Sequence, residues 1–181
     1  VGGTVSSVGI ITAPYIKAGG TDVNAGLGAR VLASNTTGVR NVAVGADALN
    51  TNTTGSSNVA VGDYAGKDLD GGSRNIAVGA YAGTSDQNGT TTGDNNISIG
   101  WESGKKLTTG SMNVGVGAST LRANTTASYN IAVGSLSLTA NTTGTRNTAV
   151  GHATLAANTT ASDNTAVGYA ALDATTTGSN N

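Results

Sequence analysis

The sequence predicts an all-β protein, a repetitive β-solenoid (β-roll) of 17-residue coils. Three observations predict it: a segment of the type NxAVG returns along most of the chain, glycine fills the fifth place of every repeat, and most repeats contain a polar NTT turn. Two short strands and two turns per repeat cannot bury an apolar face alone, whereas stacked coils can. Helical repeats are excluded because no helix tolerates this density of Gly, Asn and Thr.

The repeats are numbered below from an initial asparagine, as position 1, to position 17. All steps between these asparagines are 17 residues except one of 21, so four extra residues fall within 84–95. The nine repeats define a β-roll domain over residues 24–181, preceded by a connecting segment over residues 1–23. Asn181 stands where a tenth repeat would start, so we expect the chain to be part of something longer. The nine asparagines are Asn24, Asn41, Asn58, Asn75, Asn96, Asn113, Asn130, Asn147 and Asn164.

Position 4 is always a large aliphatic residue, which predicts the structural core of the roll. Position 2 points to the same side of an extended strand, because side chains alternate with a period of two. Position 3 points to the opposite side and holds only Gly, Ala or Ser, so we expect neighbouring chains to approach closely there. The predicted core column is Leu27, Val44, Val61, Val78, Ile99, Val116, Val133, Val150 and Val167.

The rest of the repeat predicts a corner, a second apolar column and a turn. Glycine at position 5 supplies a positive φ or a close backbone approach, which indicates a corner. Leucine at position 9 forms the second column, but three middle repeats place Gly66, Gly83 and Gly104 there. The NTT segments are turn chemistry, in which the asparagine side chain bonds to nearby backbone. These asparagines formally match glycosylation acceptor sites, but we expect them to have a structural role and to carry no glycan.

Composition indicates a thin core that needs a partner. The chain has no Phe, one Trp, one Met and 28 Gly, and much of its 37% hydrophobic content is Ala, which buries little apolar area. About two aliphatic side chains per coil are too few for an independent rod, so we expect a parallel homotrimer with cyclic symmetry. With 10% charged residues and a net charge of −1, the chain lacks the basic patch of a nucleic-acid binder.

The sequence offers no catalytic or cofactor site, so we expect a protein that is not an enzyme and binds no metal. There is no cysteine, and His152, the one histidine, lacks a second histidine for a metal site or a catalytic pair. Asp68 and Asp70, before two glycines, lack the spaced carboxylates of a calcium loop. The apolar stretch of residues 1–11 is interrupted and too short to cross a bilayer, so no membrane insertion is expected.

The unit NTAVGxxALxxNTTG resembles repeats of bacteriophage tail fibres. The segments NVAVG, NIAVG, NISIG and NTAVG of this chain are also similar to the head repeats of trimeric autotransporter adhesins, where an NSVAIG-like segment forms the inner strand of a β-roll. The opening GGTVSSVGIITAP, residues 2–14, resembles GTVTSVG segments found between modules of phage fibres. The resemblance covers residues 24–181 and implies a homotrimeric virion fibre.

The expected function is a structural and adhesive segment of a viral tail fibre, located in the virion or outside cells. Expected partners are the chain itself as a homotrimer, other virion tail proteins, and a host cell-surface glycan or protein. The alternative is the head of a bacterial trimeric surface adhesin. Two other readings are a tailspike glycan hydrolase, with Asp63 and Glu102 as carboxylates, and an ice-binding solenoid, which is disfavoured because the adjacent Thr53 and Thr54 point apart.

The irregular residues of the repeat gather in the middle of the chain. Aromatic side chains just after a corner glycine stack on sugar rings, and charged neighbours bond to sugar hydroxyls. The alternative is that these aromatic side chains pack over the space left by the missing position-9 leucines. The candidate glycan or receptor contacts are Tyr64, Tyr81, Trp101, Glu102 and Lys105.

Overall fold

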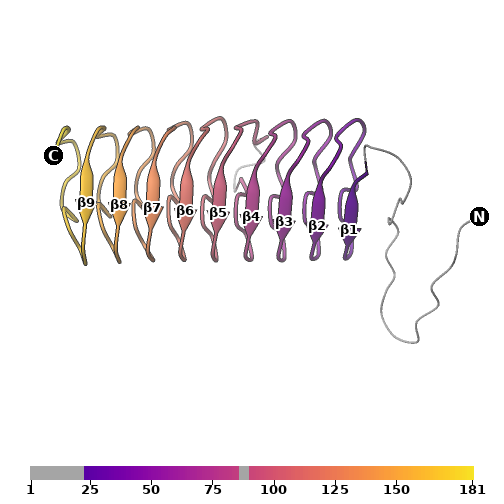
Figure 1. Cartoon of the computed structure of the whole chain (residues 1–181), viewed down its shortest axis with the longest axis horizontal. Coiled ribbons are helices and arrows are strands. Elements are labelled where there is room, and N and C mark those ends of the chain that lie inside the picture. The colour runs from indigo at the N-terminus through magenta and orange to yellow at the C-terminus, as the bar shows by residue number, and fades with distance from the viewer. Residues whose placement is uncertain (1–22, 86–89) are drawn as a thin grey trace, which may run out of the picture.

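The computed structural model describes residues 23–85 and 90–181, and it is a single β-solenoid (Figure 1). Apart from Val23, the expected connecting segment over residues 1–23 lies outside the described residues. One parallel sheet runs along the rod, with its strands in chain order from β1 to β9. The strands are β1 (Ala25–Leu27), β2 (Val42–Val44), β3 (Val59–Val61), β4 (Ile76–Val78), β5 (Ile97–Ile99), β6 (Val114–Val116), β7 (Ile131–Val133), β8 (Thr148–Val150) and β9 (Thr165–Val167).

The strand register confirms the predicted all-β solenoid of 17-residue coils. Val42 pairs with Val59, 17 residues later, and this step holds between all neighbouring strands except β4 and β5. There Ile76 pairs with Ile97, 21 residues later, so the sheet continues unchanged across the longer repeat. A parallel bridge joins Leu69 to Thr91, and Gly93 takes the place of the position-15 glycines Gly72 and Gly110. The regular register is therefore resumed by Gly93, within the predicted range of 84–95.

Each coil holds one strand of three residues, whereas the sequence predicted two short strands. The remainder of the coil turns repeatedly, because positions 7, 9 and 17 adopt the left-handed conformation in every coil. The glycine of position 5 confirms the predicted corner: its φ lies between 114° and 139° in all nine coils. A Cβ on Gly45 would lie 2.3 Å from the carbonyl oxygen of Gly62 in the next coil, so the row excludes side chains.

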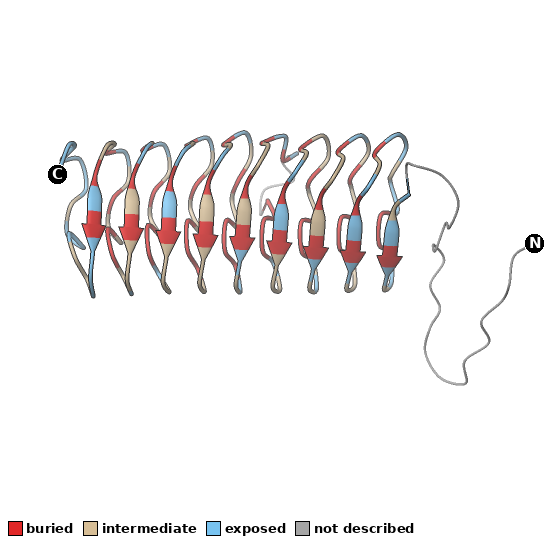
Figure 2. Cartoon of the chain, in the orientation of Figure 1, coloured by how far each residue is buried: buried red, intermediate tan, exposed pale blue. Residues whose placement is uncertain are grey.

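The predicted core column is wrong in direction, because position 4 lies on the outer side of the sheet. Ala43 and Ala60, at position 3, are fully buried, while the residues on either side of them face outward (Figure 2). The inner side of the strand lies close to the opposite part of the coil, where a Cβ on Gly26 would lie 2.8 Å from Val31 Cγ2, so the small residues of position 3 face the interior and not a neighbouring chain. The residues that were predicted as core and face outward are Leu27, Val44, Val61, Val78, Ile99, Val116, Val133, Val150 and Val167.

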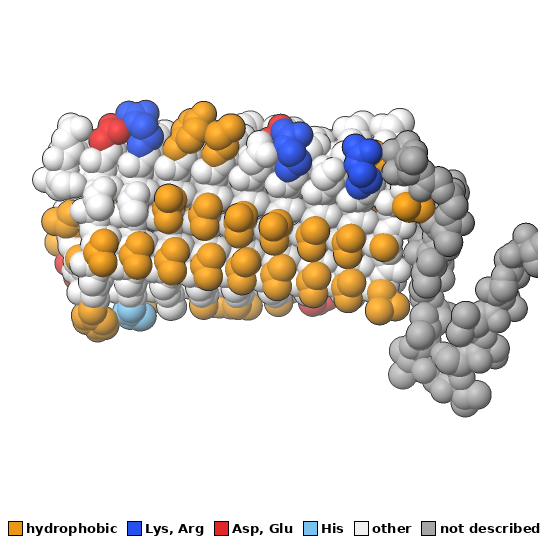
Figure 3. All heavy atoms as spheres, viewed as in Figure 1, with side chains coloured by type: hydrophobic (Ala, Val, Ile, Leu, Met, Phe, Trp, Pro, Cys, Tyr) orange, Lys and Arg blue, Asp and Glu red, His pale blue; other side chains and the backbone are white. Residues whose placement is uncertain are grey.

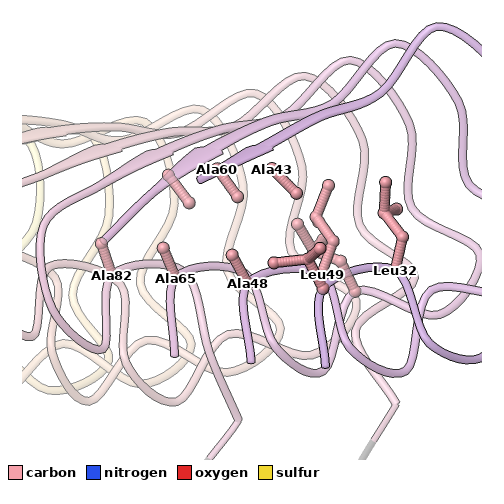
Figure 4. Close-up of a cluster of buried hydrophobic side chains, with 10 residues drawn as sticks. Leu32, Ala43, Ala48, Leu49, Ala60, Ala65 and Ala82 are labelled. Carbon is pink, nitrogen blue, oxygen red and sulfur yellow. The ribbon is translucent and has the colours of Figure 1, made fainter. Parts of the chain in front are cut away.

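The interior consists of alanines from the strand and from position 8, joined by the leucines of position 9. Figure 4 shows Leu32 and Leu49 reaching inward beside Ala43 and Ala48. The predicted position-9 column is thus confirmed as core, and Leu49, Leu138 and Leu155 have no exposed surface. The apolar interior is divided into two clusters, one within residues 31–82 and one within residues 121–166.

In two middle coils the leucine moves from position 9 to position 12. Gly66 occupies position 9 of the third coil, and Leu69, three residues later, fills the interior in its place. A Cβ on Gly66 would lie 2.9 Å from Leu69 Cδ1, so the two sites share one volume. Leu107 follows Gly104 in the same way and is also buried. In these two coils the space left by the missing leucine is therefore filled from within the coil, and not by the aromatic residues. In the coil between them no leucine replaces Gly83, which lines a small pocket with Leu69 and Leu107.

Candidate functional site

An aliphatic face runs along the outer side of the sheet. It is formed by the outward side chains of positions 2 and 4: the position-4 row continues along all nine strands, whereas the position-2 row ends in Thr148 and Thr165 at β8 and β9 (Figure 3). Val42 is 39% exposed and Ile131 is 41% exposed, values typical of the face. Contiguous apolar patches of this kind mark protein or membrane contacts in soluble proteins. Among the described residues no helix is long and apolar enough to cross a membrane.

The two margins of the aliphatic face carry the residues that vary most between coils. Position 17, just before each strand, forms the upstream margin; position 6, just after the corner glycine, forms the downstream margin. Figure 3 places basic side chains along one margin and the histidine along the other. Two ion pairs lie on the upstream margin, Arg74 with Asp94 at 3.0 Å and Arg146 with Asp163 at 2.5 Å.

Tyr64 and Tyr81 lie in neighbouring coils at position 7 and stack on each other. Their ring centroids are 5.1 Å apart and their planes differ by 4°. Lys67 Nζ lies 5.4 Å from the Tyr64 ring, and Lys105 Nζ lies 5.5 Å from the Tyr81 ring. Each tyrosine therefore has one face on the other tyrosine and a lysine ammonium over its ring.

Glu102 continues the same row, but it is buried and ion-paired. Its carboxylate accepts hydrogen bonds from Lys105 Nζ and from Arg122 Nε, both at 2.6 Å. Burial raises the pKa of Glu102, and the hydrogen bonds from the two cations lower it by more, so the pKa lies below the ordinary value. Glu102 thus lacks the raised pKa of a glycosidase general acid, and Asp63, its predicted partner, is exposed at position 6 two coils away.

A second ion pair begins the row at its other end. The guanidinium of Arg30 binds both carboxylate oxygens of Asp47, which is buried. This bonding holds the pKa of Asp47 below its ordinary value. From Arg30 to Glu102 the position-7 side chains therefore contact their neighbours along the rod, so Tyr64, Tyr81, Glu102 and Lys105 form one connected group.

Trp101 stands apart from that group. It lies at position 6, on the downstream margin of the aliphatic face, and 54% of its surface is exposed. On the upstream margin Met112 and Tyr129, in successive coils, are 48% and 57% exposed. Sequence reasoning named Trp101 but missed Met112 and Tyr129, although both interrupt a position otherwise occupied only by polar and charged residues.

A polar hollow of about 400 Å³ lies beside Lys67, on the part of the coil that returns behind the sheet. Hydroxyl groups and charged groups of both signs surround it. Asp70 accepts a hydrogen bond from the Thr53 hydroxyl there, and Asp68 accepts one from the backbone N–H of Ser85 at 3.0 Å. The lining residues are Ser34, Thr51, Thr53, Lys67, Asp68, Asp70 and Thr90.

Two other predicted features have structural roles. The NTT asparagines bond to nearby backbone as predicted: Asn52 Nδ2 donates to the carbonyl of Gly55 at 3.0 Å, and Asn141 Nδ2 donates to that of Gly144 at 2.9 Å. Both asparagines are fully buried, so a glycan cannot be attached without unfolding the turn. His152 stacks on Tyr169 with 5.3 Å between the ring centroids. Within residues 23–85 and 90–181, no group of three or more His, Cys, Asp or Glu comes together as metal ligands.

No family model, curated protein or solved structure was found to match this chain.

Proposed function

We propose that the chain is a structural segment of a homotrimeric attachment fibre, assembled through the aliphatic face. The observation that carries the proposal is the outward direction of both large columns, represented by Val42 and Val44 in β2. Placing these side chains in water costs free energy, roughly 25 cal/mol for each Å² of apolar surface left exposed. A parallel neighbour that covers them recovers this free energy along the full length of the rod.

The size of the face supports an interface between copies. Nine strands at about 4.8 Å spacing, each flanked by its margins, give a surface of roughly 40 Å by 20 Å, or about 800 Å². That is about the area that each partner contributes to a stable protein complex. Because a parallel second copy has the same coil spacing, its rows match these rows without any change of pitch. A closed cyclic arrangement then leaves no copy with an uncovered aliphatic face.

A rod of this kind supports a fibre function. The asparagine, glycine and strand rows all repeat along one axis, so length is added coil by coil without changing the cross-section. The resemblance of the repeat to those of phage tail fibres agrees with this geometry, and it suggests a virion fibre that contacts a host surface. The chemistry of the rod needs no cofactor.

For the contact with the host we propose surface polysaccharide, bound on the side of the coil away from the aliphatic face. The support is the arrangement of the Tyr64–Tyr81 stack beside Lys67, which also lines the polar hollow with Asp68 and Asp70. Tyrosine surfaces pack on sugar rings, while carboxylates and ammonium groups bond to hydroxyls. This side stays accessible when the aliphatic face is covered.

The test of the assembly is the molar mass of the purified chain in solution, measured by light scattering. A value three times the 17.5 kDa of one chain supports the trimer. A monomer at every concentration overturns the fibre assembly. Binding of isolated bacterial surface polysaccharide to the trimer, with Tyr81→Ala and Asp70→Asn as variants, tests the contact. Equal binding by all three proteins overturns the proposed site.

A further inference from the structure

Trp101 is exposed in a way that differs from the other aromatic residues after the corner glycine. Its neighbours at position 6 of the adjacent coils are Ala80 and Ala118, so no large side chain covers the indole along the rod. Tyr64 stacks on Tyr81, and His152 stacks on Tyr169. Among the described residues Trp101 has no such ring partner, and it is 54% exposed at the edge of the aliphatic face.

Met112 and Tyr129 create an apolar interruption on the opposite margin. They precede β6 and β7, and the remaining residues of this margin are polar or charged: Arg40, Ser57, Arg74, Asn95, Arg146, Asp163 and Asn180. Trp101 follows β5. The three large apolar residues therefore lie beside successive strands on opposite margins of the aliphatic face, with Met112 one strand and Tyr129 two strands from Trp101.

The aliphatic rows by themselves do not select a closed ring, in which all copies stand at equal heights, over an open stack in which each copy is shifted along the next. From β2 to β7 each coil presents nearly the same pair of aliphatic side chains, so a shift by one coil restores most of these contacts. In other repetitive assemblies a single distinctive residue fixes the register. Here the distinctive residues are on the margins, and in a cyclic arrangement of parallel copies the downstream margin of each copy meets the upstream margin of the next.

We propose that Trp101 of one copy packs against Met112 and Tyr129 of the neighbouring copy and thereby sets the register of the assembly. The inference rests on the proposed function, because it requires copies to meet through the aliphatic face. Neighbouring strands are about 4.8 Å apart, so an indole beside β5 reaches the level of β6 and the edge of β7. Trp101 would pair with the thioether of Met112 and the ring of Tyr129, both favourable contacts for an aromatic residue. A slide of several coils would place Trp101 against Arg or Ser.

Engineered disulfides test the register directly, because the chain contains no cysteine. The variant with Trp101→Cys and Met112→Cys should form covalent trimers on mild oxidation. The matched control, Trp101→Cys with Arg40→Cys, uses an upstream residue three strands away and should not. Either single variant should give no covalent trimer. Equal cross-linking by both pairs, or by neither, overturns the proposed register.

The fluorescence of the single tryptophan gives a second measurement, for which Trp101 need not be replaced. In the assembled protein its fluorescence emission should be blue-shifted and protected from acrylamide, and Met112→Glu should remove both effects while Thr143→Glu should not. Light scattering on the same samples separates the two ideas. A trimer whose Trp101 is open to acrylamide overturns the register proposal and leaves the fibre intact, whereas a wild-type monomer overturns both.

Discussion

The side-chain oxygen of Asn41 accepts a hydrogen bond from the backbone N–H of Asn58, one coil later, at 2.9 Å. Asn41 Nδ2 donates to the carbonyl of Gly55 in its own coil at 2.8 Å. One side chain thus joins two coils and closes its own turn. The same contact repeats at every step from Asn24 to Asn181, including the 21-residue step from Asn75 to Asn96.

Asn130→Ala should destabilise the rod, because the asparagine side chain makes buried hydrogen bonds to two coils. The change leaves the buried N–H of Asn147 without its acceptor, which costs about 1–3 kcal/mol. It also removes one of the two hydrogen bonds to the carbonyl of Gly144, which keeps the bond from Asn141 Nδ2. Thermal unfolding followed by circular dichroism measures the effect. Thr143→Ala, in the exposed turn, is the control and should change stability by less than about 0.5 kcal/mol. Equal melting temperatures would contradict a stabilising asparagine row.

Val133→Asp and Ala132→Asp should separate assembly from folding. Ala132 is fully buried, so a charge there has no solvent and should unfold the surrounding coils. Val133 faces outward, so aspartate there should leave the β-sheet spectrum intact while it weakens association between copies. Circular dichroism and light scattering on both variants decide the matter. If Val133→Asp lost the β-sheet spectrum while Ala132→Asp kept it, position 4 and not position 3 would be the core column.

Gly66→Leu and Leu69→Asn should each destabilise the third coil, and the double variant should recover part of the loss. Leucine at position 66 competes with Leu69 for one volume, while asparagine at 69 leaves that volume empty. Together they restore the pattern of the outer coils, where Asn35 accepts a hydrogen bond from Asn52 at 2.8 Å. A double-mutant cycle from denaturant unfolding gives the coupling. Additive losses would show that the two sites are independent.

The ion pairs predict a loss of stability in acid. The pKa values of Asp47 and Glu102 lie below their ordinary values in the folded chain. Each carboxylate therefore stabilises the fold above its unfolded pKa, and this contribution disappears as the pH falls through the folded pKa. The melting temperature should decrease from about pH 5 to about pH 2. Glu102→Gln should flatten that dependence, whereas Asp63→Asn, at an exposed site, should leave its slope unchanged.

The repeat could be read from the sequence because its spacing is strict and its residue types are separated by position. The glycine of position 5, the inward turn asparagines and the buried position-9 leucines were all predictable from the backbone and side-chain chemistry of those residues. The change of the leucine from position 9 to position 12 was also visible in the sequence. One coil has Leu49 at position 9 and Asn52 at position 12, whereas the next coil has Gly66 and Leu69 at these positions. It was missed because the glycines were read as gaps.

Of the candidate contacts, the sequence placed Tyr64 and Tyr81 in successive coils, and their stacking follows from that spacing. The ion pairs of Glu102 with Lys105 and Arg122 were not predictable, because the corner decides which side chains of neighbouring coils converge. Met112 and Tyr129 could have been found by comparing position 17 across the repeats, where two large apolar residues stand among polar ones.

The sequence by itself determined the period, the strand at positions 2 to 4 and the alternation of side chains across it, because an extended backbone turns each successive side chain to the opposite side. Which side is the interior was decided only by the tertiary structure. The alternation places Ala43 on one side of the strand and Val42 and Val44 on the other, but it does not determine which side faces the interior. Inside the coil, position 3 lies against the side chains of positions 8 and 9, where a Cβ on Gly26 would lie 2.8 Å from Val31 Cγ2, so only a small residue fits there and the larger residues face outward.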